Sequence, residues 1–411
     1  MREGWHTKRL CEVCEKITDG THQTPTYFED GIIFLSSKNV TSGRINWTDI
    51  KYIDKRQHLE MQKRVAPKIN DILLAKNGTT GVAAIVDREV KFDIYVSLAL
   101  LRPLEMVYPS YLLQFINSPL AKKQFNKRLK GMGVPNLHLE EIREVEIPIP
   151  PLSEQKRIVA ILDEAFAAIA KAKANVEKNL LNAKELFECY LQNVFENKGE
   201  DWEGSKLVKV TTKIGSGATP RGGNESYKQE GISLIRSMNV HDRFFKEKNL
   251  AFIDEKQAKD LSNVSLQEND VLLNITGASV ARCCVVPKEY LPARVNQHVA
   301  ILRPMNELID SNFLCLLLTS KFYKDQLLFT GEQGATRQAI TKVQLENFII
   351  RYPTLKEQQG IVAKLDLLSN ETKQLETIYH QKLKSLEELK KSFLQKAFNG
   401  ELNATTKTLV L

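Results

Sequence analysis

One stretch of some 45 residues constrains the fold of this chain more than any other feature. After Pro151 the sequence runs to Asn197 without a proline or a glycine. Apolar residues recur there in steps of three and four, which predicts one long helix with a coiled-coil seam. We expect Ser153 to cap the helix, Gly199 to stop it and the polar Asn179 to fix the register of the seam. The predicted seam comprises Ile158, Leu162, Ala165, Ile169, Ala172, Val176, Asn179, Ala183, Leu186 and Tyr190.

The same element returns at residues 353–399. Glu357 follows Glu154 at an offset of 203, and this offset also relates the residues around them. Thr354 and Glu357 predict a capping box, and Gly400 predicts a stop. Two rods of one length in one chain are expected to pack on each other; the alternative is two unrelated helices, each packed on its own domain. The second predicted seam comprises Ile361, Leu365, Leu368, Thr372, Leu375, Tyr379, Lys382, Leu386, Leu389 and Phe393.

The segments that precede the two rods are also related to each other. Residues 71–78 correspond to 270–277, and the Leu-Arg-Pro sequence at 101–103 corresponds to that at 302–304. A repeat of this length describes a whole domain rather than a solenoid. We therefore predict an α+β chain with a globular domain at 1–150, a helical spacer at 151–200, a second globular domain at 201–352, a second helical spacer at 353–403 and a tail at 404–411.

Each globular segment is expected to mix short strands with a few helices. Apolar or β-branched runs bounded by Gly, Asn and Pro predict strands. In the first domain these are residues 31–35, 71–75, 82–86 and 96–101. Helices are predicted at 110–116 and 119–129, and in the second domain at 312–318 and 321–328.

Composition limits the class of partner and the compartment. The net charge of +8 favours an anionic partner, and the longest apolar stretch, Phe313 to Leu318, suits a buried helix rather than a membrane span. The sequence also shows no secretory signal, so we expect a soluble, cytoplasmic protein. Cys11 and Cys14 form a C-x-x-C pair without a second pair at zinc spacing, and the adjacent Cys283 and Cys284 suit a strand. Reduced thiols and no metal site are the expectation.

The sequence holds no catalytic signature that we can identify. It lacks a G-x-x-x-x-G-K-[ST] phosphate loop and the Asn-Pro-Pro-aromatic or Asp-Pro-Pro-Tyr tetrapeptides of adenine methylation. His22, His138 and His298 have no triad or metal partner at a recognisable spacing. Structural or substrate-contacting roles are therefore expected for them rather than general-base roles.

Polar loops at matching places in the two domains give the stronger functional signal. They mix Gly with Thr, Ser, Asn, Gln, Lys and Arg, the residue types that hydrogen-bond to base edges and phosphates. Ordinary surface turns are the alternative for any single loop. The loops are residues 18–27, 36–39, 76–80 and 131–138, then 215–224, 236–239, 274–279 and 331–338.

These loops and one basic helix supply the candidate DNA-binding residues. Lys122, Lys123, Lys127, Arg128 and Lys130 lie on the helix, where Lys123, Lys127 and Lys130 share a face that suits a phosphate backbone or a solvated surface equally. The candidates are Thr21, His22, Thr24, Lys38, Asn39, Lys76, Asn77, Thr79, Lys123, Lys127, Asn136 and His138 in the first domain. In the second they are Ser216, Thr219, Arg221, Arg236, Asn239, Asn274, Thr276, Arg337 and Gln338.

The whole chain resembles the specificity (S) subunit of type I restriction–modification systems. Its most specific part is the start of each rod, residues 151–163 and 355–366, where a Pro-x-x-x-Glu-Gln-x-x-Ile form runs from Pro150 and again from Pro353. The Gly-Thr-His-x-Thr-Pro stretch at 20–25 resembles the opening of a target recognition domain, with 216–220 as a looser counterpart. Gly360 stands where the first rod has Arg157, so the two rods are equivalent but not identical.

The resemblance implies a subunit without catalytic activity of its own. Each domain would read one half of a split target in double-stranded DNA, and the rods would pair antiparallel with pseudo-twofold symmetry and set the gap between the half-sites. The rods would also dock two methyltransferase subunits, and restriction–translocase subunits would join them. S-adenosylmethionine, ATP and Mg would serve those partners, with no cofactor bound by this chain. The residues expected in rod pairing or docking are Glu154, Gln155, Ile158, Leu162, Ile169, Val176, Glu357, Gln358, Ile361, Leu365, Leu375 and Leu386.

Three other interpretations remain open at this point. The chain could be a self-contained nuclease or methyltransferase with a diverged site. It could be a coiled-coil scaffold for protein partners. It could also serve a related system whose partner fuses methyltransferase and nuclease.

Overall fold

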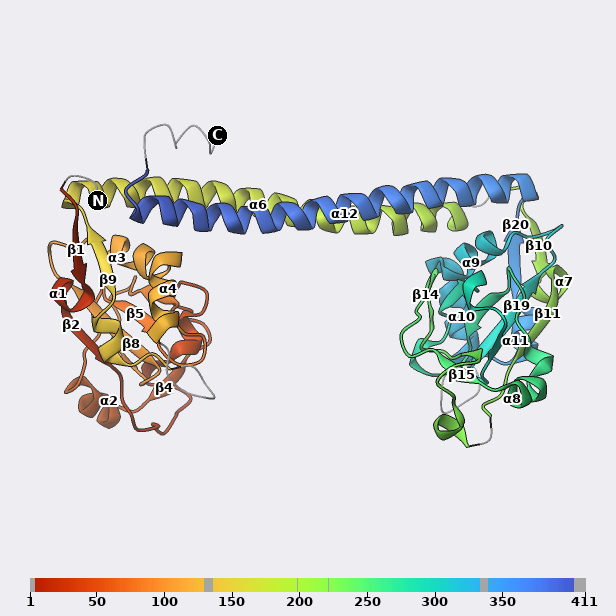
Figure 1. Ribbon diagram of the computed structural model, residues 1–411, viewed down its shortest axis with the longest axis horizontal. Coiled ribbons are helices and arrows are strands. Elements are labelled where there is room, and N and C mark those ends of the chain that lie inside the picture. The colour runs from red at the N-terminus through yellow and green to blue at the C-terminus, as the bar shows by residue number, and fades with distance from the viewer. Residues whose placement is uncertain (1–3, 129–135, 198, 221, 333–338, 403–411) are drawn as a thin grey trace. The chain divides into compact units, whose positions relative to one another are not determined.

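The structure is a computed structural model that describes residues 4–128, 136–197, 199–220, 222–332 and 339–402. It divides into two compact units. The first comprises residues 1–177 and 380–411, so it joins the two ends of the chain, and the second comprises residues 178–379. Each unit holds one globular domain and the parts of two long helices that lie beside it (Figure 1).

The strands of the first unit form three small sheets. β1 (His6–Arg9) pairs with β9 (Glu146–Ile149) in an antiparallel ribbon. A four-stranded antiparallel sheet has the order β2 (Cys14–Asp19), β8 (Leu98–Pro103), β5 (Ile72–Ala75) and β6 (Ala83–Ile85). A three-stranded sheet has the order β4 (Lys51–Ile53), β3 (Ile32–Leu35) and β7 (Phe92–Ile94), with β3 and β7 parallel. The four predicted strands of this domain are therefore present.

Short helices connect these strands, and two longer ones follow them. The helices are α1 (Leu10–Val13), η1 (Ser37–Val40), α2 (Lys55–Gln62), α3 (Pro109–Ile116), α4 (Pro119–Arg128) and α5 (Leu139–Arg143). Both predicted helices, at 110–116 and 119–129, correspond to α3 and α4. α3 lies between the strands and the long helices (Figure 1).

The four-stranded sheet of the first unit is buried on both faces. Successive residues of a strand point to opposite faces. On β5, Ile72 and Leu74 join the core that contains α3 and the long helices, whereas Leu73 and Ala75 join the core shared with the three-stranded sheet. This double burial explains why β5 is a continuous apolar run rather than an alternating one.

The second unit repeats this topology strand for strand. β10 (Glu203–Lys206) pairs with β20 (Ile349–Tyr352). The four-stranded sheet has the order β11 (Thr211–Ser216), β19 (Val299–Pro304), β16 (Val271–Asn274) and β17 (Cys283–Val285). The three-stranded sheet has the order β15 (Ala251–Ile253), β12 (Ile232–Ile235) and β18 (Ala293–Val295). One addition is a two-stranded hairpin of β13 (Val240–His241) and β14 (Phe244–Phe245).

The helices of the second unit also follow the order of the first. They are α7 (Leu207–Val210), α8 (Glu255–Asp260), α9 (Ser311–Thr319), α10 (Lys321–Glu332) and α11 (Lys342–Asn347), with short 3-10 turns at η2 (Gly223–Ser226), η3 (Ser262–Val264), η4 (Gly277–Ser279) and η5 (Lys288–Tyr290). α9 includes the predicted buried helix at Phe313 to Leu318, every residue of which is buried.

The adjacent cysteines lie on a strand, as predicted. Cys283 faces the core with α9, and Cys284 faces the core with the three-stranded sheet. Burial raises the pKa of both thiols, and it raises the pKa of Cys14 to about 12. All six cysteines lie among the described residues, and each is free.

The two predicted rods are α6 (Leu152–Glu196) and α12 (Leu355–Phe398), of 45 and 44 residues. In the first unit the start of α6 packs against the end of α12, with Ile158, Leu162 and Phe398 in one core. In the second unit the end of α6 packs against the start of α12, through Leu191 and Leu365. The helices therefore pair antiparallel. Within the described residues, neither these nor any other helix is apolar enough along its length to cross a bilayer.

The pairing in the first unit ends in an aromatic cluster. The ring of Phe398 meets those of Tyr111 and Phe115 at centroid distances of 5.2 and 5.3 Å. Edge-on aromatic contacts of this kind contribute beyond the area that they bury. The first domain is therefore completed by residues from the far end of the sequence.

The predicted seam is correct in the first part of α6 and wrong in its second half. Ile158, Leu162, Ala165 and Ile169 are buried as expected, but Asn179 and Leu186 are exposed. The half-buried Leu180 and Phe187 alternate with the buried Ala183 and Leu191, so the buried stripe moves by one residue. An α-helix has 3.6 residues per turn and drifts against a seam counted in threes and fours. Asn179 consequently cannot fix the register.

The second rod departs from prediction in the same way. Leu365, Thr372 and Phe393 are buried, and Ile361 and Leu386 are half-buried. Leu375, Lys382 and Leu389 are exposed. Val176, predicted on the first rod, is half-buried.

The ends of the rods differ slightly from the predicted caps. α6 starts one residue before Ser153, and the carbonyl of Pro151 accepts hydrogen bonds from the amides of Glu154 and Gln155. Ser153 therefore lies inside the first turn and does not cap it. α12 starts directly after Thr354 and is followed by Gly400 at φ +76°, the left-handed conformation expected of a helix stop.

Gln155 and Gln358 have a role that the sequence analysis did not assign. Both are fully buried, so neither is available to a partner. Gln155 accepts from the amide of Tyr108 and donates to the carbonyls of Met106 and Pro150, at 2.8–3.0 Å. Gln358 repeats all three bonds with Asp310, Leu308 and Pro353. Each glutamine thus ties its rod to the globular domain before it.

A repeated ion pair fixes the loop that leads into the central strand. Arg102 donates to both carboxylate oxygens of Asp71 at 2.7 and 2.8 Å and to the carbonyl of Ala66 at 3.0 Å. Arg303 makes the same bonds to Asp270 and to the carbonyl of Ser265. This bidentate geometry explains why the Asp and Leu-Arg-Pro segments occur in both halves.

Candidate nucleic-acid interface

The loop at residues 20–25 lies over the turn between β7 and β8. The amide of Thr21 donates to the carbonyl of Ile94, and Val96 donates back to Thr21. Gly20 makes this approach possible, because a Cβ there would stand 1.8 Å from the carbonyl oxygen of Ile94. Gly217 has the same role in the second unit, where a Cβ would stand 1.7 Å from the oxygen of Val295. The two loops therefore occupy equivalent positions.

In the first unit this loop forms one wall of a groove of about 770 Å³. The other wall is formed by α2, which contributes Arg56 and Gln57, and by Arg64, two residues after the end of the helix. Gln57 holds the loop in place by accepting from the amide of Thr26 and donating to its carbonyl, at 2.9 and 3.0 Å. Hydroxyl, imidazole, amide and guanidinium groups thus converge on one concave surface, which is what reading base edges requires.

A buried carboxylate organises the charges at this groove. Asp19 is 2% exposed and pairs with Lys76 at 2.8 Å, with Arg64 and, at 3.2 Å, with His22. Burial alone would raise the pKa of Asp19, but the hydrogen bonds from Lys76 and Arg64 outweigh it and hold that pKa below its usual value. Arg64 is thereby held at the edge of the groove with its side chain still 47% exposed.

A second groove of about 370 Å³ is lined in part by Tyr95. Thr24 and Tyr95 share a hydrogen bond of 3.2 Å between their hydroxyls. Lys38 is exposed at this groove, and the ammonium of Lys51 lies 3.9 Å from the centre of the Tyr27 ring. Two of the predicted loops, 18–27 and 36–39, therefore come together here.

Four of the predicted residues are buried and support the loops from inside. The side-chain oxygen of Asn39 accepts from the amide of Ser36, and its side-chain amide donates to the carbonyl of Asp49. Asn239 accepts from the amide of Arg236 and donates to the carbonyl of Lys246 in the same way. Asn274 donates to the carbonyl of Ser237, and Lys76 pairs with Asp19. Because all four have at most 6% of their surface exposed, they are not accessible to bases in this structure.

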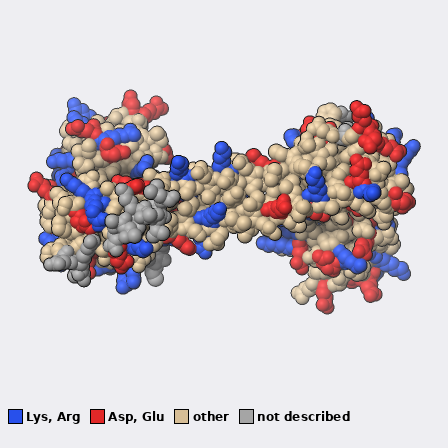
Figure 2. All heavy atoms as spheres, turned by 90° about the horizontal axis from the view of Figure 1, so that it is seen from above, with Lys and Arg blue, Asp and Glu red and all other residues tan. Residues whose placement is uncertain are grey.

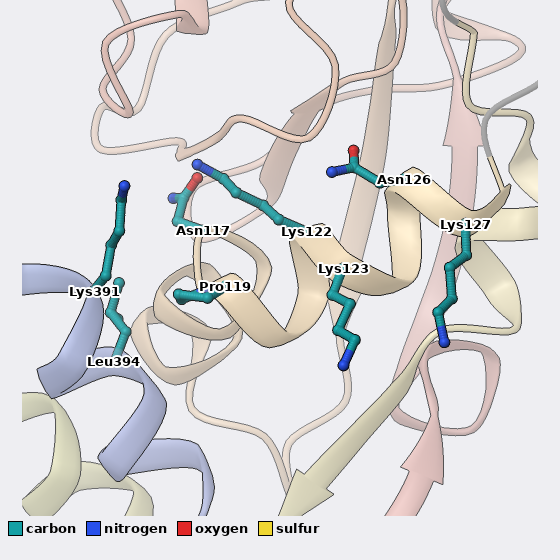
Figure 3. Close-up of a pocket in the computed structure, with 8 residues that line it drawn as sticks. All are labelled: Asn117, Pro119, Lys122, Lys123, Asn126, Lys127, Lys391 and Leu394. Atoms are coloured by element: carbon teal, nitrogen blue, oxygen red, sulfur yellow. The ribbon is translucent and has the colours of Figure 1, made fainter. Parts of the chain in front are cut away.

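The remaining candidates of the first unit are half-buried or exposed, and the side-chain oxygens of Asn77 and Asn136 are themselves buried. Asn77 and Asn136 form an isolated backbone bridge, which brings the loop after β5 to the segment before α5. Thr79 and His138 are exposed. Lys123 and Lys127 are exposed on α4 and extend from the same side of it (Figure 3).

In the second unit a chain of polar groups links two predicted loops. Thr219 donates to Gln297, whose amide lies 3.2 Å from His298, and His298 lies 2.5 Å from the hydroxyl of Thr276. Arg236 donates to the carbonyl of Asn249 and stacks over Tyr227 at 5.2 Å. Ser216 is exposed at the end of β11. The predicted residues Arg221, Arg337 and Gln338 lie outside the described residues.

Sequence reasoning missed Arg56, Gln57, Arg64, Tyr95 and Gln297. The first three lie on or next to α2, a helix of eight residues that the sequence analysis did not identify. The signal that was available is the basic pair at each end of that helix, Lys55-Arg56 and Lys63-Arg64. Tyr95 and Gln297 lie in the turn that the loop crosses, a contact that only the fold reveals.

Charge on the wider surface is mixed rather than segregated. Figure 2 shows lysine and arginine side chains interspersed with aspartate and glutamate on both units in the view drawn. Among the described residues, no group of three or more His, Cys, Asp or Glu side chains has the arrangement of a metal site. The grooves are thus built for hydrogen bonding and local charge.

The comparisons with known proteins agree with this arrangement. Residues 2–178 and 199–387 match the type I restriction modification DNA specificity domain. The chain belongs to this type I specificity family.

Two specificity subunits match this chain over nearly their whole length. The EcoKI specificity subunit of Escherichia coli K12 is 22% identical over 98% of this chain and 90% of its own length. The putative MjaX specificity subunit of Methanocaldococcus jannaschii is 23% identical over 98% of this chain and 95% of its own.

Solved structures show the same fold. The crystal structure of the HsdS subunit from Thermoanaerobacter tengcongensis matches with a TM-score of 0.63 and 22% identity, over 98% of each chain. A chain from a structural study of complex assembly in a type I R-M system matches with a TM-score of 0.73 and 22% identity, over 98% of this chain and 99% of that chain. The two-domain, two-rod architecture is therefore that of type I specificity subunits.

Proposed function

We propose that this chain gives a type I restriction–modification complex its DNA sequence specificity, with each globular domain reading one half of a split target. The observation that carries the proposal is the duplicated loop-over-turn geometry with different side chains. In the first unit Thr24 of the loop bonds to Tyr95 in the turn before β8, and in the second unit Thr219 of the loop bonds to Gln297 in the turn before β19. One scaffold with two sets of polar groups suits two different half-sites.

The antiparallel helices support a second part of the proposal, in which they set the gap and dock methyltransferase subunits. Each helix is about 66 Å long at 1.5 Å per residue. Apolar side chains remain exposed on them, including Leu181, Leu367 and Ile378 at 55, 60 and 48%. Leu367 and Ile378 are eleven residues apart and so lie on one face of α12. Such a stripe suits a partner helix. Two equivalent surfaces in one chain would take two copies of one partner.

Catalysis is assigned to those partners rather than to this chain. S-adenosylmethionine, ATP and Mg would be bound by the methyltransferase and restriction subunits.

A methylome with exchanged domains tests the proposal. The chain is expressed with its neighbouring methyltransferase in a methylation-free host, and modified bases are located across the genome. The native pair should give one split motif. Replacing residues 4–150 with the first domain of a subunit of different specificity should change one half-site only. The donor must keep aromatic residues at positions 111 and 115, because both contact Phe398.

The reciprocal exchange is the matched control. Replacing residues 202–352 should change the other half-site and leave the first. If either exchange alters both half-sites, modular reading by the two domains is wrong. If the native pair is soluble and assembled yet methylates nothing at a defined sequence, the specificity role itself is contradicted.

A further inference from the structure

A basic groove lies in the first unit between α4 and the end of α12. It has a volume of about 580 Å³. Its lining residues are Asn117, Pro119, Lys122, Lys123, Asn126, Lys127, Lys391 and Leu394. Lys122 of α4 and Lys391 of α12 extend in the same direction, whereas Lys123 and Lys127 extend to the other side of α4 (Figure 3). Pro119 and Leu394 supply an apolar floor.

The positive charge of this groove has no carboxylate among the lining residues to balance it, and the nearby Glu387, whose pKa Lys391 helps to lower, does not line the groove. None of the lining residues is acidic, and Lys122 and Lys391 have no ion-pair partner in the part of the chain that the structure describes. Glu387, one turn before Lys391, is already paired with Lys173 at 2.9 Å. Burial lowers the pKa of Lys122, and the nearby Lys390 and Lys391 lower it further. An anion placed here would relieve this crowding.

The corresponding place in the second unit is occupied by the chain itself. Lys324 of α10 is the counterpart of Lys122, and it pairs with Asp242 at the tip of the β13–β14 hairpin. The next residue, Arg243, pairs with Glu188 of α6, which stands at the position of Lys391 at the offset of 203. Arg243 also stacks over Phe187 at 5.0 Å. A peptide turn with a carboxylate therefore fills the space between domain and rod.

The first unit shows no such hairpin among its described residues, and the charge at the rod is reversed from Glu188 to Lys391. Residues 129–135 and 403–411 contain no aspartate or glutamate, so these segments offer no acidic side chain for the groove. We infer that the groove between α4 and α12 binds an acidic peptide turn of a protein partner, whose carboxylates pair with Lys122 and Lys391. This inference rests on the proposed function, which makes the methyltransferase subunit that partner.

A DNA phosphate is the other anion to weigh, and two observations favour the peptide. The second unit places a peptide turn, with its carboxylate, at the equivalent lysine. The apolar floor of Pro119 and Leu394 suits side chains of a peptide better than a phosphodiester. Lys123 and Lys127, on the other side of α4, stay available for phosphates.

Charge reversal in the assembled complex tests the inference. The variant K122E/K391E is compared with K68E/K91E, which makes the same change of charge at two exposed lysines of the first unit outside every groove described here. Affinity for the purified methyltransferase subunit is measured by titration calorimetry at low and high salt. K122E/K391E should bind about tenfold more weakly at low salt, with a smaller difference at high salt, because exposed interfacial charge pairs are screened. The control should bind like the native chain.

Zero-length coupling with a carbodiimide identifies the anion. This reagent joins lysines to carboxylates in contact, so peptide mapping should find Lys122 or Lys391 coupled to an aspartate or glutamate of the methyltransferase subunit. The neutral variant K122Q/K391Q should lose these products and keep the native thermal unfolding curve, which separates lost binding from lost folding.

Two results would overturn the inference. Unchanged assembly with a reduced salt dependence of DNA binding would identify DNA phosphate as the occupant. Unchanged assembly and unchanged DNA binding would leave the groove without either ligand. Both differ from failure of the proposed function, in which the native chain itself would form no complex with the methyltransferase or methylate no defined sequence.

Discussion

The buried glutamine at the start of each rod leads to a quantitative prediction. Gln155 makes three hydrogen bonds of 2.8–3.0 Å that join α6 to the start of α3. Substituting Gln155→Met keeps most of the side-chain volume but leaves one amide and two carbonyls buried without a partner. At roughly 1 kcal/mol for each such group, the first unit should lose about 3 kcal/mol of stability.

Hydrogen exchange of the Tyr108 amide is the direct assay, because this amide donates to Gln155. A loss of about 3 kcal/mol corresponds to roughly a hundredfold faster exchange at one decade per 1.4 kcal/mol. Lys156→Ala, a change at the next residue, which is exposed, should leave the exchange rate as it is. Gln358→Met should have the same effect on the Asp310 amide in the second unit.

If Gln155→Met exchanges like the native protein while Gln155→Ala does not, the side chain acts by filling space. The three hydrogen bonds would then contribute little, and the repeat of this glutamine in both rods would reflect packing alone.

Three further predictions follow from the ion pairs and the rods. Asp19→Asn should lower the free energy of unfolding of the first unit most at neutral pH, and the difference from the native protein should shrink as pH falls below about 4. The reason is that a carboxylate with a lowered folded-state pKa stabilises only while it is ionised. A difference in urea unfolding that does not depend on pH would contradict this. Arg102→Lys and Arg303→Lys should each cost about 2 kcal/mol, since lysine cannot keep the bidentate geometry, and hydrogen exchange should localise each loss to its own unit. Inserting four residues at the middle of both rods lengthens them by about 6 Å, which is close to two base pairs at about 3.4 Å each. The methylated motif should therefore keep its half-sites and widen its gap. An unchanged gap with full methylation would show that the rods do not set the gap.

Much of the architecture could be predicted because the spacing of apolar residues and the repeat of whole segments can be recognised even where single positions deviate. The rods, the duplicated domain and the apolar strands were all identified from repeated patterns. The buried face of the second half of α6 was not, since Leu186 continues the counted pattern but is exposed while Phe187 is half-buried. Counting steps of three and four cannot show where a helix of 3.6 residues per turn shifts its buried stripe.

The candidate interface was predictable in position but not residue by residue. A polar residue in a loop either faces outward or turns inward to satisfy backbone groups, and sequence does not distinguish these. Asn39 and Asn239 turn inward, whereas Thr24 remains at the surface. Arg64 contributes from outside the predicted loops because it is held by Asp19, a residue 45 positions earlier. Contacts of this kind depend on the tertiary fold.

The discontinuous composition of the first unit has a consequence for biosynthesis. Phe393, Leu394 and Phe398 belong to its core, although they are made after every residue of the second unit. At roughly 5–20 residues per second, the ribosome spends some 10–40 s on the intervening chain, during which the N-terminal domain lacks part of its apolar cover. The second domain can complete its core earlier. The second domain would thus complete its core before the first, although it is translated later. A chaperone would be needed most while the nascent N-terminal domain waits for the end of α12.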